Sequence, residues 1–219
     1  MYKDLQAIRG KFHIRRLIDE GEHEHQDFKF KISDAHKIAH SISAFANNDG
    51  GRLLVGVKDN GTVAGIRSEE DLHVIEAAAT VFCRPAVEVG MQAYLCEEGA
   101  VVLKASIPKA QHRPVECKEA DGTWRAYYRV ADENIVAHPL MVRAWRLAEE
   151  ETIPPLAYSA TEARLLSALE ARKAASVEEL MVDSHLSRHN AEDVITRLAA
   201  MGIIGFEYYH PSFLLTINR

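Results

Sequence analysis

The sequence predicts an α+β fold, a mixed sheet with flanking helices, followed by a smaller C-terminal domain. Up to residue 150, strand-like runs with alternating or continuous apolar residues are interspersed with helix-like runs. The pair Pro154-Pro155 then interrupts the pattern, as a linker does. Beyond it the pattern changes to three helical stretches and a hairpin. We therefore expect domains at residues 1–150 and 160–219, joined by a linker at 151–159.

Length and composition are those of a folded globular protein. The 219 residues are 47% hydrophobic and 26% charged, which allows two modest domains. No apolar run approaches the roughly 20 residues needed to cross a bilayer, and the charged N-terminus lacks the apolar segment of a signal peptide. Three widely spaced cysteines (Cys83, Cys96 and Cys117) without a CxxC pair favour a reducing cytoplasm and argue against a structural zinc site.

The net charge of -6 argues against broad affinity for nucleic acids. Such affinity comes from counterion release, which requires clustered Lys and Arg side chains. A local basic patch still acts inside an acidic protein. A nucleic-acid hypothesis for this chain must therefore name the residues of its patch.

The first third of the chain contains the clearest elements. Apolar side chains at helical spacing predict a helix over residues 11–20. In residues 27–32 apolar and charged side chains alternate, which predicts a strand with one buried face. Its polar face would carry Asp27, Lys29 and Lys31.

A second helix and a strand pair follow. The apolar stripe of residues 35–47 predicts the helix, and the Asn-Asn-Asp-Gly-Gly run at its end suits a helix C-terminus. The continuous apolar run at 52–57 predicts an interior strand. Asp-Asn-Gly at 59–61 then predicts a tight turn into a partner strand over 62–66.

The middle of the chain has weaker signals. We expect, in order, a helix at 68–83, strands at 87–95, 101–107 and 124–130, and a helix at 137–150. A polar loop over 108–122 would join the last two strands, and loops of this length are often functional.

Two histidines on the second predicted helix raise the question of a metal. His36 and His40 lie four residues apart, which is the spacing of a helical zinc-binding pair. No third ligand is evident from the sequence. We therefore interpret the two as part of a polar helix face.

The last 60 residues have the element order of a winged helix-turn-helix. Three predicted helices are followed by a hairpin over 203–217. Arg188, His189 and Asn190 begin the third helix, where base contacts are made in this fold. Glu192 on the same helix would repel DNA, so a protein–protein or dimerisation role is the alternative.

Short motifs over residues 5–145 resemble, in their order and spacing, the Schlafen AlbA-type domain, also called the divergent AAA-type family of DNA-binding domains. The matching residues are Gly21-Glu22, Asp27-Phe28-Lys29, Ala44-Phe45-Ala46-Asn47, Gly50-Gly51, Gly56-Val57-Lys58-Asp59, Gly61, Gly65, Arg113-Pro114 and Tyr128-Arg129-Val130. In bacteria this domain is often followed by a winged helix in proteins described as transcriptional regulators. The resemblance thus implies a regulator that binds DNA or RNA. No Walker motif supports ATP binding.

The resemblance also implies an enzymatic alternative, because some animal relatives are metal-dependent endoribonucleases with three acidic residues. Their roles would fall on Glu22, Asp27 and Asp59, with Lys29 beside them, and the three carboxylates would bind Mg²⁺ or Mn²⁺. This chain departs from the pattern twice: Asp27 stands in place of a glutamate, and Lys58 in place of a carboxylate. The alternative is that all three are ordinary surface acids.

A basic patch that could contact phosphates is the remaining candidate site. It would consist of Lys29, Lys31, Arg113, Arg125 and Arg129, if the fold brings them together. Three functions stay open at this point: a nucleic-acid-binding regulator, a metal-dependent nuclease, and an oligomeric protein-interaction module, the last with a second copy of the chain as partner.

Overall fold

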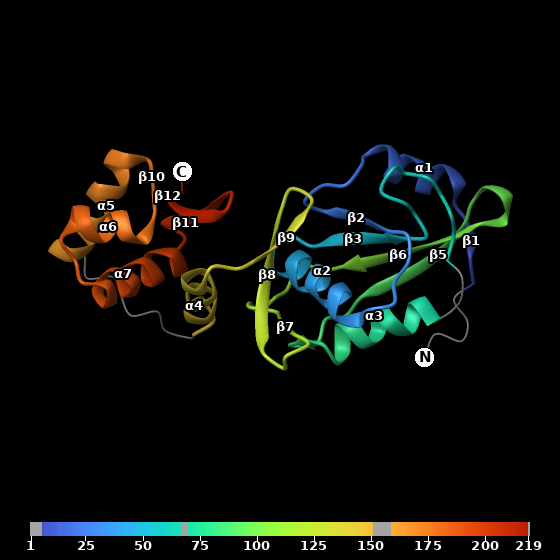
Figure 1. Cartoon of the computed structure of the whole chain (residues 1–219), viewed down its shortest axis with the longest axis horizontal. Coiled ribbons are helices and arrows are strands. Elements are labelled where there is room, and N and C mark those ends of the chain that lie inside the picture. The colour runs from blue at the N-terminus through green and yellow to red at the C-terminus, as the bar shows by residue number, and fades with distance from the viewer. Residues whose placement is uncertain (1–5, 67–69, 151–158, 219) are drawn as a thin grey trace. The chain divides into compact units, whose positions relative to one another are not determined.

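The computed structural model describes residues 6–66, 70–150 and 159–218 (Figure 1). The chain divides into two compact units, residues 1–136 and 137–219. The boundary expected at residue 150 falls differently, because the helix before it packs with the second unit. The predicted linker at 151–159 lies, except for its last residue, outside the described residues.

The first unit contains the predicted mixed sheet. Its strand order is β1-β5-β6-β3-β2; β1 pairs with β5 and β2 with β3 in parallel, and the remaining neighbours are antiparallel. Strand β2 therefore lies at one edge of the sheet. The strands are β1 (Ile8–Arg9), β2 (Gln26–Lys29), β3 (Gly51–Val55), β5 (Gly90–Leu95) and β6 (Val101–Ile107).

Helices cover both faces of this sheet (Figure 1). On one face α1 (Lys11–Asp19) packs its apolar stripe against Leu54 of β3. On the other face α2 (Ala35–Asn47) and α3 (Glu70–Thr80) pack against Leu53. Burial on both sides explains why β3 reads as a continuous apolar run. The helix expected at 68–83 is described from residue 70 and ends at Thr80, before Cys83 enters a strand.

A second, four-stranded antiparallel sheet has the order β4-β7-β8-β9. Its strands are β4 (Cys83–Arg84), β7 (Glu116–Lys118), β8 (Trp124–Val130) and β9 (Glu133–Val136). The prediction of a loop over 108–122 was wrong at β7. That strand is too short for a periodicity signal, and it forms because β4 and β8 pair with it. Strands β4 and β9 were not predicted.

The polar residues at the end of α2 attach the four-stranded sheet to this helix. Asn47 donates from Nδ2 to the carbonyl oxygens of Val115 (2.9 Å) and Tyr127 (2.9 Å), and its Oδ1 accepts from the Val115 N–H (2.8 Å). Ser43 accepts from the Tyr127 N–H, and Asn48 bonds both backbone groups of Arg129. We call Ser43, Asn47 and Asn48 the α2 clamp. It satisfies backbone groups of the β7–β8 region that would otherwise be buried without partners.

Several predicted strands are shorter than expected: the one predicted at 87–95 begins at Gly90, and the one predicted at 52–57 ends at Val55. Strand β2 ends at Lys29, so Phe30 and Lys31, which were predicted to belong to the strand, lie after its end. The expected partner strand over 62–66 is reduced to one bridge between Val57 and Val63. A 3-10 turn, η1 (Glu97–Gly99), follows β5.

The second unit has its own core. Its elements are α4 (Pro139–Ala148), α5 (Ala160–Arg172), β10 (Ala174–Ala175), α6 (Val177–Ser184), α7 (Arg188–Ala200), β11 (Ile204–Tyr209) and β12 (Ser212–Ile217). Leu165, Leu180 and Ile195 are completely buried in it, and Leu140 of α4 packs in the same cluster. Capping boxes begin α5 and α6, at Ser159 and Ser176, which accounts for their clear sequence signals. None of the helices in the described ranges is long and apolar enough to cross a membrane.

Candidate functional site

The carboxyl ends of β2 and β3 meet at one edge of the five-stranded sheet. The strands are parallel, so the residues that follow them leave the sheet side by side. Gly56 holds them together, because its N–H donates to the Lys29 carbonyl oxygen (2.8 Å). Its φ is +93°, and a Cβ there would lie 2.7 Å from the backbone of Gly65. Only glycine fits this position. Open sheets commonly bind ligands at such an edge.

An aromatic ring with two lysine side chains near it marks this edge. Lys31 Nζ lies 5.0 Å from the centroid of the Phe30 ring, and Lys58 Nζ lies 5.3 Å from it. Phe30 is half-buried and both lysines are exposed. We call these three residues the Phe30 platform. Lys58, which stands where the family pattern has a carboxylate, thus brings a second cation to the ring. Sequence reasoning had not identified Phe30 or Lys58 as binding residues, although the Lys-Phe-Lys run was visible.

Two of the three predicted acids form a carboxylate pair. Oε1 of Glu22 accepts a hydrogen bond from the Phe28 N–H (2.8 Å). Burial raises the pKa of Glu22; the Phe28 N–H opposes this shift, and the adjacent Asp27 carboxyl adds to it. Glu22 therefore lies beside Asp27, where its charged form is disfavoured.

Asp27 is buried and paired with two cations. The expectation that it lies on the polar face of its strand, available to a ligand, was therefore wrong. Its side chain is covered by the rest of the unit, since α2 and β8 lie over this face of β2. Oδ2 of Asp27 lies 2.5 Å from Lys29 Nζ, and Oδ1 lies 3.5 Å from Nη2 of Arg129. Two cations thus share one carboxylate, and a metal ion would have to displace them from its oxygens.

Arg129 also departs from its predicted role. It is only 1% exposed, so it cannot contact a phosphate at the surface. Its guanidinium lies over the Phe45 ring at 5.0 Å and donates to Oδ1 of Asn134 at 2.8 Å. Arg129 is therefore a buried structural cation. The basic patch proposed from the sequence loses this member.

Asp59 and Glu22 line the same cleft. This cleft has a volume of about 1000 Å³, and Glu22, Asp59, Glu97 and Glu98 line it together with Lys11. Among the described residues, the three predicted acids do not gather at one point: the one set of three His, Cys, Asp or Glu side chains with ligand atoms within 4.8 Å is His40, Cys117 and Glu119. The carboxylate oxygens have the right chemistry for Mg²⁺ or Mn²⁺, but this arrangement, two together and one apart, does not fit a three-carboxylate site.

The other predicted basic residues have different surroundings. Lys29 forms an ion pair with Asp27, and its Nζ also donates to the Phe28 carbonyl oxygen. Arg113 is half-buried and donates from Nη1 to the Asn47 carbonyl oxygen (3.2 Å). Arg125 is exposed on β8. Of the predicted patch, Lys31 is the residue that the structure places on the Phe30 platform.

In the second unit, the predicted DNA-contacting residues are exposed at the start of α7 and engaged with acids. Arg188 bonds Glu178 (3.0 Å) and Glu192 (3.3 Å). His189 lies 3.3 Å from Asp193. Asn190 is exposed, and its backbone N–H donates to the helix-capping Ser187 hydroxyl. The cations at this helix end are thus balanced by neighbouring carboxylates.

Comparison with known proteins identifies the family. Two solved structures are similar to this chain, with low sequence identity and low TM-scores. One is the DIP2311 protein from Corynebacterium diphtheriae (21% identity, TM-score 0.43), where the match covers 67% of this chain and 33% of that chain. The other is the N-terminal domain of a RecG-related protein from Nitrosomonas europaea (16%, TM-score 0.41), covering 69% of this chain and 99% of that one.

The present chain therefore spans about a third of the Corynebacterium protein. No curated protein matches the sequence. Residues 22–138 match the family profile described as Schlafen, AlbA_2, and this is more than half of the 219 residues. It includes β2, α2 and β3, and hence the edge that carries the Phe30 platform. The chain belongs to the Schlafen AlbA_2 family.

Proposed function

We propose that this protein binds nucleic acid, and that a strand of RNA or DNA lies across the carboxyl ends of β2 and β3. The observation that supports this proposal is the Phe30 ring with Lys31 and Lys58 both within 5.3 Å of its centroid. Single strands are bound by aromatic side chains on which bases stack, flanked by cations that contact the phosphates. The Phe30 platform offers both groups within one surface.

The proposal is compatible with the acidic composition. A local patch acts on phosphates even when the net charge is -6, because salt screens charges beyond about 10 Å. The acids of the neighbouring cleft, among them Glu97 and Glu98, would repel a phosphate backbone. A bound strand is therefore expected to follow the platform and avoid the cleft.

Binding of fluorescently labelled single-stranded RNA, single-stranded DNA and duplex DNA tests the proposal. We expect a single strand to bind the full chain, and the double variant Lys31→Glu, Lys58→Glu to lose that binding. Neutralising both lysines (to Gln) should lower the salt slope by about 1.4, since each phosphate contact contributes about 0.7 for a single strand. Phe30→Leu should weaken binding by about tenfold through lost stacking. Lys37→Glu, an exposed lysine of α2, is the matched control.

The outcome that contradicts the proposal is specific. It fails if the wild-type chain binds none of the three probes at low salt. It also fails if the double lysine variant binds as the wild type and the Lys37→Glu control do.

A more specific proposal is that residues 160–219 are a winged helix and that the protein regulates transcription. Its support is the order of α5, α6, α7 and the β11–β12 hairpin, with Arg188, His189 and Asn190 exposed at the start of α7. Duplex DNA would have to replace Glu178 and Glu192 as the partners of Arg188.

Duplex binding by the second unit is tested with Arg188→Ala in the full chain. We expect salt-dependent binding in the wild type and its loss in this variant. Arg164→Ala, which removes an exposed arginine of α5, should leave binding unchanged. The absence of a wild-type shift at low salt would contradict the regulator proposal.

The nuclease alternative is favoured by one observation, that Glu22 and Asp59 line the same cleft beside the platform. It requires Asp59 to join the Glu22–Asp27 pair. Under this alternative, Asp59→Ala should abolish Mn²⁺-dependent cleavage of RNA, whereas Asp121→Ala, an acid in another exposed turn, should not. If the wild type cleaves no RNA with Mg²⁺ or Mn²⁺, the alternative is rejected.

A further inference from the structure

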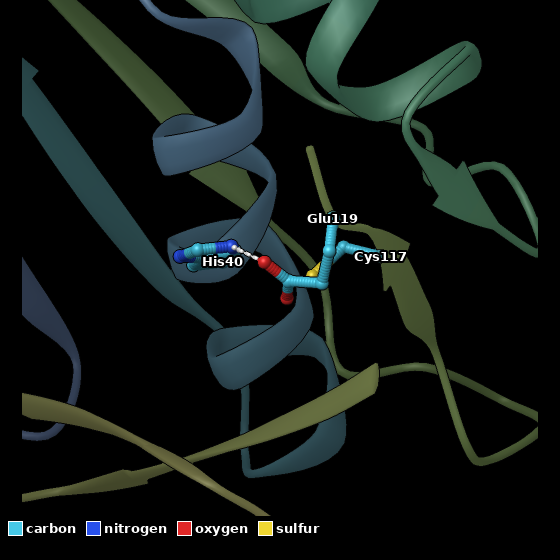
Figure 2. Close-up of side chains that lie close together, drawn as sticks. All are labelled: His40, Cys117 and Glu119. Atoms are coloured by element: carbon cyan, nitrogen blue, oxygen red, sulfur yellow. Dashed lines mark hydrogen bonds and ion pairs between the residues drawn. The ribbon is translucent and has the colours of Figure 1, made fainter. Parts of the chain in front are cut away.

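A second cluster of side chains lies away from the platform, where α2 meets the four-stranded sheet. His40 projects from α2 toward Cys117 of β7 and Glu119, which follows that strand (Figure 2). Their ligand atoms all lie within 4.8 Å of one another. Cys117 and Glu119 reach the same point because alternate residues of a strand share one face.

We propose that His40, Cys117 and Glu119 bind a thiophilic divalent cation of the Zn²⁺ type. Imidazole nitrogen, thiolate sulfur and carboxylate oxygen are the three ligand types that Zn²⁺ uses in proteins. The thiolate selects against Mg²⁺ and Ca²⁺, which take oxygen ligands. With three protein ligands, the fourth tetrahedral position is left for water.

The distances favour closure of such a site around an ion. Nε2 of His40 lies 3.2 Å from Oε2 of Glu119. Two such ligands on one tetrahedral Zn²⁺, with bonds near 2.1 Å, lie about 3.4 Å apart. The pair therefore already has the spacing that a shared ion needs. A thiolate at a Zn–S distance of about 2.3 Å would have to approach somewhat closer than the present limit of 4.8 Å.

Neighbouring groups hold the ligands in place. The Tyr127 hydroxyl donates to the other oxygen of Glu119, Oε1, at 2.9 Å. The Tyr127 ring stacks on the His40 ring, with centroids 4.2 Å apart and planes inclined by 18°. Tyr127 is therefore a positioning residue for two of the three ligands, as residues behind metal ligands commonly are.

Burial sets a condition on binding: it raises the pKa of the Cys117 thiol, so an ion would have to displace the thiol proton. Cys117 is fully buried, whereas the side chains of His40 and Glu119 are 24% and 18% exposed. An ion would enter from the side of His40 and Glu119 and meet the sulfur at the inner end. Cys83 pairs with Cys117 across the β4–β7 ladder, but its Sγ is not in the set of ligand atoms that lie within 4.8 Å of one another. We therefore assign the thiolate to Cys117 alone.

A bound ion would cross-link α2 to the β7–β8 hairpin. His40 and Cys117 are 77 residues apart in the sequence. The α2 clamp joins the same two segments, through Asn47 and Val115. Ion binding to the folded state alone stabilises it by mass action. The site is thus expected to stabilise the attachment of the four-stranded sheet, independently of nucleic-acid binding.

Cobalt substitution tests the proposal with the full chain under reducing conditions. We expect one equivalent of Co²⁺ to give the near-ultraviolet thiolate-to-cobalt charge-transfer band that reports a Co–S bond, and Zn²⁺ to displace the Co²⁺. Cys117→Ser should abolish the band, whereas Cys83→Ser and Cys96→Ser should retain it. His40→Asn and Glu119→Gln should each weaken Co²⁺ binding at least tenfold. Thermal unfolding should shift upward with Zn²⁺ in the wild type and stay constant in Cys117→Ser.

The result that overturns the proposal is a wild-type chain without the band at stoichiometric Co²⁺, or a band that survives in Cys117→Ser. Circular dichroism of each variant shows whether it is folded. If Cys117→Ser does not fold, the wild-type spectrum and Glu119→Gln decide the question instead.

Discussion

At the scale of the residue, Arg129 shows how a surface interpretation fails when a side chain is buried. We predicted that Arg129, in the Tyr-Arg-Val motif, is a surface cation that contacts phosphates. In the fold it is covered by Phe45 and bonded to Asn134, and it balances Asp27. No local feature of the sequence shows that β8 turns this side chain inward, because the partners lie far away in the chain.

Removing Arg129 should destabilise the protein. Arg129→Met leaves Asp27 buried with Lys29 as its remaining cation, and losing one member of a buried pair costs about 3 kcal/mol. Denaturant unfolding, followed by fluorescence, measures this cost. Arg125→Met on the same strand is exposed and should change the free energy of unfolding by less than about 0.5 kcal/mol. Equal effects of the two substitutions would contradict the buried role.

Glu22 gives a prediction for pH. Its pKa in the folded state is raised above the usual 4.5, chiefly by burial, so the protonated form is favoured by folding. The contribution of Glu22 to stability is therefore present below pH 4.5 and is lost as pH rises through the folded-state pKa. Glu22→Gln removes this loss. Relative to the wild type, the variant should gain stability as the pH rises from 4 to 7, measured by thermal unfolding.

A Glu22→Gln difference from the wild type that stays constant between pH 4 and pH 7 would contradict this expectation.

At the scale of the element, prediction succeeded where the signals are local. Helix α2 falls on the predicted residues 35–47, since its apolar stripe and the Asp34 cap are both encoded within it. Strands β4, β7 and β9 have two to four residues each and exist through their pairing. For the same reason the Glu22–Asp27 pair was predictable from neighbouring positions, whereas the meeting of His40 with Glu119 was not.

The α2 clamp is the element-scale feature that most depends on one residue. Asn47 is fully buried and makes three hydrogen bonds to the backbone of Val115 and Tyr127. Asn47→Ala would leave those backbone groups without these partners, at about 1 to 3 kcal/mol for each unsatisfied group. We expect a loss of about 3 kcal/mol or more in the free energy of unfolding. Backbone amide exchange in β7 and β8 should quicken at the same time.

Asn60 is the matched control for this change. It lies exposed in the turn after β3, where its Oδ1 accepts from the Thr62 N–H. Asn60→Ala should cost about 1 kcal/mol or less and leave exchange in β7 and β8 unchanged. If Asn47→Ala behaves in the same way, the clamp does not hold the sheet.

At the scale of the whole molecule, the two units have separate cores and separate tryptophans. The described hydrophobic clusters of the first unit contain no residue of the second, and the reverse also holds. Trp124 belongs to β8 in the first unit, and Trp145 to α4 in the second. Each tryptophan, in a background where the other is phenylalanine, reports the unfolding of its own unit.

This division yields a prediction for core substitutions. Leu180 of α6 is fully buried in the second core, so Leu180→Ala should cost about 2 to 5 kcal/mol there. The Trp145 transition should move to lower denaturant while the Trp124 transition stays in place. Ile75→Ala, a fully buried residue of α3 in the first core, should do the opposite. If either substitution moves both transitions equally, the two cores unfold as one cooperative system, and the separation seen in their contacts has no energetic counterpart.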